Sequence, residues 1–374
     1  MENRNLHIVC HDIPYPADYG GVFDLFYKIQ TLYQEGIQIH LHCFTSGRPE
    51  QPVLNTLCKE VFYYSRKTGH KGFSHQIPYI VCSRSSPELM ERLLQDEYPI
   101  LLEGVHCTYL LQDSRFASRK ILIRLHNVES VYYQQLAACC QSWFKKMYYL
   151  HESAVLKKYE RRIASHWPLL AVTESDAHRA AVSYQSKNIS VIPVFLPFQY
   201  IASPQGTGCY CLYHGNLAVE ENEKAVIWLL ENVFSILPLP FLVAGKQPGA
   251  KLVRAVERYK NCCMVPDPSD SELNDLISKA QIHVIPSFNC TGIKLKLLNA
   301  LFNGRHCLVN EEAVKETGLQ ELCHLANSPE DFRQKIEMLY ERPFTFLDLQ
   351  FRQEKLLHQF DNHQTASRLI AQIW

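Results

Sequence analysis

The chain has 374 residues, which is enough for two domains of ordinary size. Its composition, 47% hydrophobic and 20% charged, is typical of a soluble globular protein. The 38 basic and 38 acidic side chains cancel, so no overall positive field predicts a nucleic-acid partner, and any anion site must be local.

Cysteine spacing and hydropathy bear on metal binding and on location. The chain has 14 cysteines, but no two of them form a C-x-x-C pair, so we expect reduced thiols and no zinc. No apolar run has the length of a membrane span, and no signal peptide precedes the first predicted strand. We therefore expect a cytoplasmic protein.

The first half of the chain alternates between strand and helix patterns. Strands are predicted at 6–11, 37–44, 99–105, 120–127, 169–173 and 190–195. One long helix is predicted over 129–163. A helix over 22–36 is predicted to place its apolar face at Phe23, Phe26, Ile29, Leu32 and Tyr33.

A second α/β pattern begins after a stretch rich in Pro, Gly and Ser at 196–208, which is the predicted linker. Strands are predicted at 209–215, 240–246, 262–267 and 281–287, with helical segments between them. We therefore predict an α/β protein with two doubly wound Rossmann-like domains, 1–195 and 209–353, facing a cleft. A C-terminal helix at 354–374 could pack back on the first domain.

One segment of the second domain favours anions. In SFNCTGIKLKLLNALFNG, Gly292 follows a predicted strand, and Lys294 and Lys296 lie at the start of a predicted helix. A helix N-terminus offers free N–H groups and a positive dipole end, both of which suit a phosphate. An ordinary helix start with two solvated lysines is the alternative.

Other polar residues also lie where predicted strands end. The loop PYPADYGG contains Gly20 and Gly21 but lacks the G-x-G-x-x-G of a dinucleotide site, and a plain turn is its alternative. In RLHNVESVYY, His126 is a candidate functional residue, with a structural histidine as the alternative. The remaining candidates are Tyr19, Glu103, Asn127, Glu129, Asn216 and Lys246.

The segment from Trp143 to Arg162 interleaves aromatic side chains with six lysines and arginines. It could be an interfacial helix that touches anionic lipid, as a peripheral membrane contact. A core helix with solvated basic side chains is the alternative.

Taken in order, these segments resemble the retaining GT-B glycosyltransferases of group 1, the family 4-like branch. PYPADYGGVFDLF resembles their N-terminal glycine loop, RLHNVESVYY their R-x-H-N-x-E block, and LYHGNLAVEENEKAVIWLL the start of their donor domain. VIPSFNCTGIKLKLLNAL resembles their nucleotide-binding block, written G-[ST]-G-I-K-x-K-x-x-E-A. The resemblance extends over most of the chain and implies the GT-B fold.

The resemblance also implies roles for individual residues. His126 would act at the reacting sugar, and Lys296 would neutralise the leaving group, so both are predicted to be catalytic. The donor nucleotide-sugar would be bound by Gly20, Gly21, Asn216, Lys246, Gly292, Ile293, Lys294 and Asn299. The acceptor side would include Tyr19, Glu103, Asn127 and Glu129. No metal and no cofactor are implied, because lysines and helix dipoles carry the charge.

The chain departs from this pattern in its donor motif. The two family glutamates are Thr291 and Asn299 here, and the first glycine of the block is Cys290. The Arg and Lys usual after the first strand of the donor domain are missing: Asn216 stands in that loop, and Lys224 lies further along. The predicted donor motif is therefore divergent.

We accordingly expect a metal-independent, hexosyltransferase-like glycosyltransferase acting in polysaccharide biosynthesis. It would move a sugar from a nucleotide-sugar donor to a saccharide or lipid-linked saccharide acceptor, with retention. Two alternatives are open: a catalytically degenerate GT-B protein that binds a partner in polysaccharide assembly, and a nucleotide-sugar epimerase. A phosphorylase would usually be much longer and would carry a cofactor lysine that we do not identify.

Overall fold

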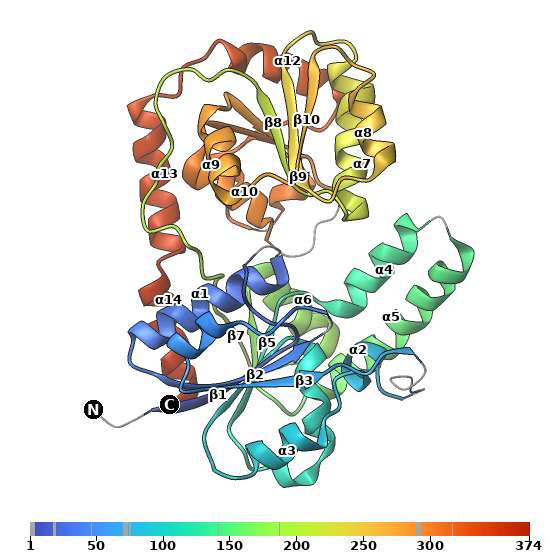
Figure 1. Cartoon of the computed structure of the whole chain (residues 1–374), viewed down its shortest axis with the longest axis vertical. Coiled ribbons are helices and arrows are strands. Elements are labelled where there is room, and N and C mark those ends of the chain that lie inside the picture. Colours follow the sequence, from blue (N-terminus) through green and yellow to red (C-terminus); the bar gives the residue numbers. More distant parts are fainter. Residues whose placement is uncertain are drawn as a thin grey trace. The chain divides into compact units, whose positions relative to one another are not determined.

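The computed structural model describes residues 4–17, 20–45, 47–69, 74, 76–140, 142–186, 188–288, 293–315 and 317–374. The chain forms two compact units (Figure 1). Unit 1 comprises Met1–Pro197 and Phe360–Trp374, and unit 2 comprises Phe198–Gln359. Each unit is built around its own parallel β-sheet.

The sheet of unit 1 has seven parallel strands in the order β3-β2-β1-β4-β5-β6-β7. The strand order reverses between β1 and β4, so the loops after these two strands diverge to opposite faces of the sheet. The strands are β1 (Asn5–Cys10), β2 (Gln38–Thr45), β3 (Glu60–Ser65), β4 (Ile100–Glu103), β5 (Ile121–Leu125), β6 (Leu169–Ala171) and β7 (Ile189–Val191).

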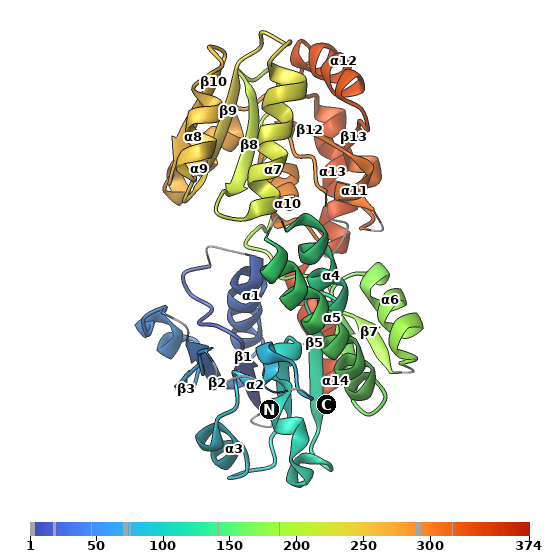
Figure 2. The ribbon, with the colours of Figure 1, turned by 90° about the vertical axis from the view of Figure 1, so that its right-hand side faces the viewer.

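Helices cover both faces of this sheet, and two of them, α4 and α5, lie side by side (Figures 1 and 2). Short 3-10 helices η1 (Pro52–Thr56), η3 (Val105–Gln112) and η4 (Ser114–Phe116) supplement them. The helices are α1 (Gly20–Gln34), α2 (Tyr79–Cys82), α3 (Pro87–Leu93), α4 (Glu129–Cys139), α5 (Trp143–Ala164), α6 (Glu174–Tyr184) and α14 (Asn362–Ile373).

The sheet of unit 2 has six parallel strands in the order β10-β9-β8-β11-β12-β13, and its strand order reverses between β8 and β11. The strands are β8 (Cys211–Asn216), β9 (Phe241–Lys246), β10 (Cys262–Pro266), β11 (Ile282–Val284), β12 (His306–Val309) and β13 (His324–Leu325). Its helices are α7 (Glu220–Leu229), α8 (Ala250–Val256), α9 (Asp270–Lys279), α10 (Leu295–Asn303), α11 (Glu311–Val314), α12 (Pro329–Tyr340) and α13 (Phe346–Gln359), with a π-turn at Leu230–Phe234 and a 3-10 helix at Gln320–Leu322.

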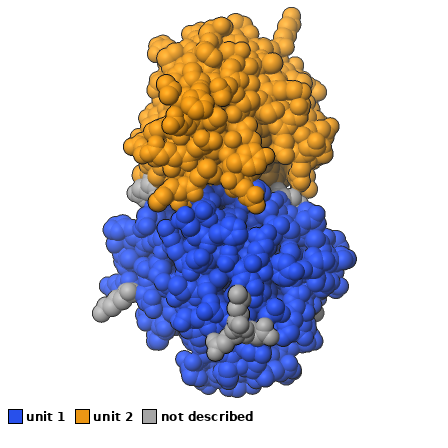
Figure 3. Space-filling view, turned by 90° about the vertical axis from the view of Figure 1, so that its left-hand side faces the viewer, with its two compact units in different colours: residues 1–197, 360–374 blue, residues 198–359 orange. Residues whose placement is uncertain are grey.

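The last residues of the chain return to unit 1 (Figure 3). One helix was expected over 354–374, but α13 ends at Gln359 and α14 begins at Asn362. Asp361 separates them, because its carboxylate accepts a hydrogen bond from the backbone N–H of Gln364 and so caps the new helix. Ala366, Leu369 and Ile373 of α14 join the core against α1.

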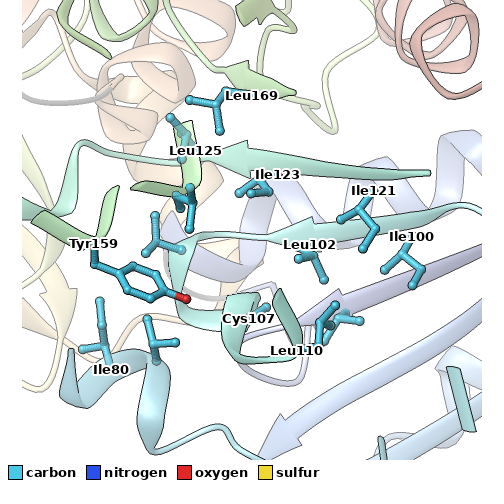
Figure 4. Packing of buried hydrophobic residues seen from close by; sticks show 14 of the residues in the cluster. Ile80, Ile100, Leu102, Cys107, Leu110, Ile121, Ile123, Leu125, Tyr159 and Leu169 are labelled. Carbon is cyan, nitrogen blue, oxygen red and sulfur yellow. The ribbon is translucent and has the colours of Figure 1, made fainter. Parts of the chain in front are cut away.

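Alternation along the strands of unit 1 sends successive side chains to two separate apolar cores. On one face, Ile100, Leu102, Ile121 and Ile123 pack with the helix α5 residue Tyr159 (Figure 4). The intervening strand residues, among them Leu101 and Leu122, face α1 and α14 in the second core. Residues 103 and 124 continue this second series, so the side chains of Glu103 and Arg124 point toward α1.

Two further expectations differ from the structure, and four elements of it were not expected. The predicted helix over 129–163 is two helices, because the backbone is extended at Cys140 and Ser142. The predicted apolar face of the first helix is wrong in part: Val22, Leu25, Ile29 and Leu32 are buried, whereas Tyr33 is exposed and the two phenylalanines are half-buried. Strand β3 and helices α2, α3 and α6 were not predicted.

Candidate functional site

Polar side chains of unit 1 gather at the carboxyl ends of its central strands. The register places Glu103 of β4 beside Cys10 of β1 and beside Arg124 of β5. In open parallel sheets this edge, next to the point where strand order reverses, is the usual place for a ligand.

Helix α1 brings two more charges to this edge. The Nζ of Lys28 lies 2.7 Å from Glu103 Oε1 and 3.1 Å from Asp24 Oδ2. Asp24 accepts hydrogen bonds from the guanidinium of Arg124 at 2.9 and 3.1 Å and from the backbone N–H of Phe195 at 2.7 Å. All four charged side chains are buried. Two anions and two cations thus neutralise each other in the interior.

His126 connects this buried network to the surface. Its Nε2 lies 3.0 Å from Glu103 Oε2, and its Nδ1 lies 3.9 Å from Asp24 Oδ2. The side chain is 16% exposed, whereas that of Glu103 is fully buried. Burial alone would raise the pKa of Glu103, but Lys28 and then His126 lower that pKa to about 2. Glu103 is therefore a carboxylate that orients the imidazole.

The same side chains bear on metal binding. Asp24, Glu103 and His126 each offer one ligand atom within 4.8 Å of the others. However, Lys28 and Arg124 already neutralise both carboxylates, and a cation there would face two buried positive groups. We read this group as a salt-bridge network and propose no metal site in it.

The remaining residues predicted in unit 1 take different positions. Gly20 and Gly21 begin α1, and Asn127 is half-buried. Tyr19 lies outside the described residues. Glu129 is the first residue of α4 and is buried. Burial and then the neighbouring Glu160 raise the pKa of Glu129 to about 8, so this carboxyl is largely protonated at neutral pH.

The predicted site in unit 2 is centred on Lys296. Its Nζ donates to the hydroxyl oxygen of Tyr213 at 2.7 Å and to Asn222 Oδ1 at 2.6 Å, and it lies 4.7 Å from the centre of the Tyr213 ring. Asn222 in turn donates from Nδ2 to the carbonyl of Asn216. Desolvation lowers the pKa of Lys296 to about 8, although Glu221 opposes this shift. The lysine is thus fixed where β8 ends.

The backbone beside this arrangement takes a conformation that favours glycine. Gly215, at the end of β8, has a φ of +155°, and a Cβ added there would lie 3.6 Å from Lys296 Cδ and 3.5 Å from Asn222 Nδ2. The loop after β11 contacts α7, the helix that carries Asn222: Ser287 Oγ donates to Glu221 Oε1 at 2.6 Å. The ends of β8 and β11, between which the strand order reverses, therefore both contribute polar groups.

The other residues predicted to bind the donor lie on α10, just before it, or at the end of β9. Lys294 precedes α10, and its carbonyl accepts from the N–H groups of Leu297 and Leu298. Asn299 Oδ1 accepts from Asn303 Nδ2 at 2.7 Å, one turn along the helix. Ile293 is half-buried, Lys246 ends β9, and Gly292 lies outside the described residues.

Sequence reasoning missed four residues of these sites: Asp24 and Lys28 in unit 1, and Tyr213 and Asn222 in unit 2. The signal for the first two was a pair of opposite charges four residues apart in an otherwise apolar helix. Their partners Arg124 and Glu103 lie 100 and 75 residues away, which the pattern does not reveal. None of the helices in the described part of the chain combines the length and the apolar character that a membrane span needs.

No model of a known protein family matches the chain. Among curated proteins, it is 29% identical over 318 residues to an uncharacterised 44.6 kDa protein in the cps region of Klebsiella pneumoniae, a match that covers 79% of this chain and 80% of that protein.

Solved structures match the whole chain. Sucrose-phosphate synthase of Thermosynechococcus elongatus has a TM-score of 0.70 at 14% identity, covering 98% of this chain and 97% of that one. The Anabaena protein HepE in complex with UDP and glucose has a TM-score of 0.66 at 11% identity, covering 99% of both chains. The trehalose-phosphate synthase of Burkholderia xenovorans, solved with glucose-6-phosphate, has a TM-score of 0.66 at 11% identity, covering 99% of this chain and all of that one. With two parallel-sheet α/β domains of seven and six strands and these neighbours, the chain has the GT-B fold.

Proposed function

We propose that the chain is a retaining glycosyltransferase that moves a hexose from a nucleotide-sugar donor to a saccharide or lipid-linked saccharide acceptor. The observation that carries this proposal is Lys296, which Tyr213 and Asn222 hold at the end of β8 within a GT-B fold. Similarity to HepE, solved with UDP and glucose, supports a uridine nucleotide as the donor group.

The donor half of the reaction needs positive groups on the diphosphate. Breaking the anomeric C–O bond leaves negative charge on the departing nucleotide, and preorganised donors lower the barrier by meeting that charge. Lys296 is already oriented by two hydrogen bonds, and α10 begins one residue before it, so the positive end of the helix dipole lies beside this lysine. Ile293, Lys294 and Lys246 would bind the same nucleotide.

The acceptor half would use His126. Glu103 accepts a hydrogen bond from Nε2 and so fixes the orientation of the imidazole, whose partly exposed edge would meet the substrate. Gly20 and Gly21, at the start of α1, would leave room for a sugar close to the backbone. The cysteines of the described residues are free thiols, which supports a cytoplasmic setting.

A panel of UDP, GDP, ADP, CDP and TDP, tested without metal by thermal shift, is the first experiment. A ligand that binds only the native state at 100 times its Kd stabilises it by about 2.7 kcal/mol, so even a weak nucleotide should raise Tm. We expect one base to give the largest shift and Lys296→Met to abolish it, while Lys251→Met, at an exposed lysine of α8, leaves it unchanged.

Transfer is tested separately from binding. His126→Ala should reduce sugar transfer about 100-fold or more while nucleotide binding stays near wild type, because general acid–base groups contribute on that order. His166→Ala, at an exposed histidine, is the control. Equal loss of binding and transfer in His126→Ala would show a structural histidine and would contradict the proposed role.

A catalytically degenerate, partner-binding protein is the second candidate, because one observation favours it. Asn299, which replaces a family glutamate, has its side-chain oxygen bonded to Asn303. If no nucleotide shifts the Tm and no nucleotide-sugar is turned over, this candidate replaces the first. An epimerase would instead convert a nucleotide-sugar with no acceptor present.

A further inference from the structure

The first two turns of α5 expose an unusual concentration of apolar side chains. Five of the sixteen large hydrophobic residues that are exposed in the described part of the chain are Trp143, Phe144, Met147, Tyr148 and Leu150. Trp143 is 67% exposed and Phe144 80% exposed. Only Tyr149 among residues 143–150 is half-buried, and its ring lies 5.9 Å from that of Tyr133 in α4. This half of α5 is therefore anchored on one side only.

Helical geometry places three of these five exposed residues on one face. Residues three or four apart share a face, so Trp143, Met147 and Leu150 lie in line with Lys157 and Arg161 on the side opposite the buried residues. The near half of this face carries three apolar side chains with Lys146 beside them, and the far half carries Lys157 and Arg161. We call the exposed side chains of residues 143–162 the α5 surface.

Both acidic residues of α5 point away from this surface. Glu152 accepts a hydrogen bond from the backbone N–H of Tyr79, and Glu160 accepts from the backbone N–H groups of Glu129 and Ser130 and from the hydroxyl of Tyr184. Both glutamates are buried. The exposed charges of α5 are then all basic: Lys145, Lys146, Lys157, Lys158, Arg161 and Arg162. Both glutamates of α5 therefore accept hydrogen bonds from backbone N–H groups at the starts of α2 and α4.

We propose that the α5 surface docks on an anionic lipid bilayer. Such a surface has the two properties that this face complements: anionic headgroups for the basic half, and a hydrocarbon region for tryptophan, phenylalanine and methionine. Helices α4 and α5 lie side by side (Figure 2), so docking uses an element that already packs on unit 1. The proposal goes beyond the proposed reaction, since it requires neither donor nor acceptor.

Vesicle co-sedimentation of the full chain tests this proposal. Vesicles of phosphatidylcholine alone are compared with vesicles of equal parts phosphatidylcholine and phosphatidylglycerol. We expect binding to the anionic vesicles, weakened roughly tenfold or more by Lys157→Ser with Lys158→Ser, because each basic residue near a lipid surface adds attraction. High salt should weaken it similarly. Trp143→Ser with Phe144→Ser should abolish it.

Matched controls distinguish binding through the α5 surface from non-specific binding through other exposed apolar or basic residues. Phe346→Ser with Leu347→Ser removes two exposed apolar residues of α13, and Lys251→Ser with Lys260→Ser removes two exposed lysines of unit 2. Both should bind vesicles like wild type. Tryptophan emission should shift to the blue on binding in wild type, and Trp143→Phe should remove that shift while keeping most of the binding.

Three outcomes would overturn the proposal. The wild-type chain does not bind anionic vesicles, or the α5 variants bind them as well as their controls do. Alternatively, the chain forms a dimer without lipid, and Trp143→Ser with Phe144→Ser dissociates it, which would assign the surface to a second copy. Unfolding midpoints of all variants ensure that a loss of binding does not reflect a loss of fold.

Discussion

Lys28 and Glu103 are both fully buried and form an ion pair, which Asp24 extends on the lysine side and His126 on the carboxylate side. Glu103 could be singled out in the sequence because a charge ends an apolar run, and its pairing with His126 follows from two adjacent strand ends. Lys28 could not, because its charge lies among apolar helix positions and nothing in the pattern shows that a carboxylate 75 residues away will meet it.

Removing the cation of this pair should be costly. Lys28→Met removes the ammonium nearest to Glu103 and leaves His126 as its side-chain hydrogen-bond partner. Breaking a buried ion pair costs about 3–5 kcal/mol. We expect a loss of about 3 kcal/mol in the free energy of unfolding, measured with urea. Lys120→Met, at an exposed position of the same unit, should cost less than about 0.5 kcal/mol. A loss below about 1 kcal/mol in Lys28→Met would indicate that His126 alone can neutralise Glu103.

Lys296 should make nucleotide binding depend on pH. Its pKa of about 8 in the free protein means that it loses its proton as pH rises through 8, whereas a bound diphosphate would keep it protonated. Affinity should therefore be constant below pH 7 and fall up to tenfold per pH unit above 8, as measured by calorimetry with the nucleotide that gives the largest thermal shift. Lys296→Arg stays charged and should not show this fall. The same slope in both proteins would contradict the assignment.

At the scale of elements, strand positions were easier to predict than helix faces. Buried parallel strands appear as short apolar runs, and each run in the first half except β3 was recognised. The first helix was misread because its aromatic residues suggested the core face. Ile29 and Leu32 of the predicted face are buried, but Val22 and Leu25 complete that face in place of the aromatic residues. The polar side chains of Asp24 and Lys28 are buried beside it. A buried charge on a helix is visible only once its partner is known.

The start of α4 offers a test by pH. Burial raises the pKa of Glu160, but the N–H and O–H groups that it accepts from favour its charged form. Burial and then Glu160 raise the pKa of Glu129 to about 8, against an ordinary 4.5. Between these values the native state holds a proton that the unfolded state has released, so stability falls as pH rises from 4.5 to 8.

Glu129→Gln removes this dependence. We expect it to equal wild type near pH 4.5 and to exceed it on the order of 3 kcal/mol above pH 8, measured by urea unfolding at several pH values. Glu174→Gln, at the exposed first residue of α6, is the control and should follow the wild-type curve. A Gln variant at position 129 that is less stable than wild type at pH 8 would refute the neutral-carboxyl interpretation.

At the scale of the whole molecule, the alternation of strands and helices and the position of the linker predicted two doubly wound domains, and the GT-B fold is confirmed. Glu103, His126 and Lys296 were predicted because they lie near strand ends, where ligands bind in such sheets. Tyr213 and Asn222 around Lys296 were not, because their contacts depend on side-chain directions that periodicity does not fix.

Histidines buried in both units should make the fold sensitive to acid. Burial lowers the pKa of His7, His11, His42, His106, His214 and His283. Below pH 6.5 these histidines bind protons in the unfolded chain but stay neutral in the native state, so the free energy of unfolding falls as pH falls. His283→Gln should reduce this slope by about 1.4 kcal/mol per pH unit, and exposed His358→Gln should not. Unfolding curves from pH 7.5 to 5 measure it, and equal slopes would contradict the prediction.

The return of α14 to unit 1 sets an order of events during synthesis. Unit 2 is continuous from Phe198 to Gln359, so all of its residues exist before the ribosome reaches the last helix. Unit 1 begins first but lacks Leu369 and Ile373, which cover its α1 side, until the segment that follows unit 2 has been translated. We therefore expect unit 1, which is translated first, to be completed only after unit 2, and a nonsense codon within α14 to destabilise unit 1.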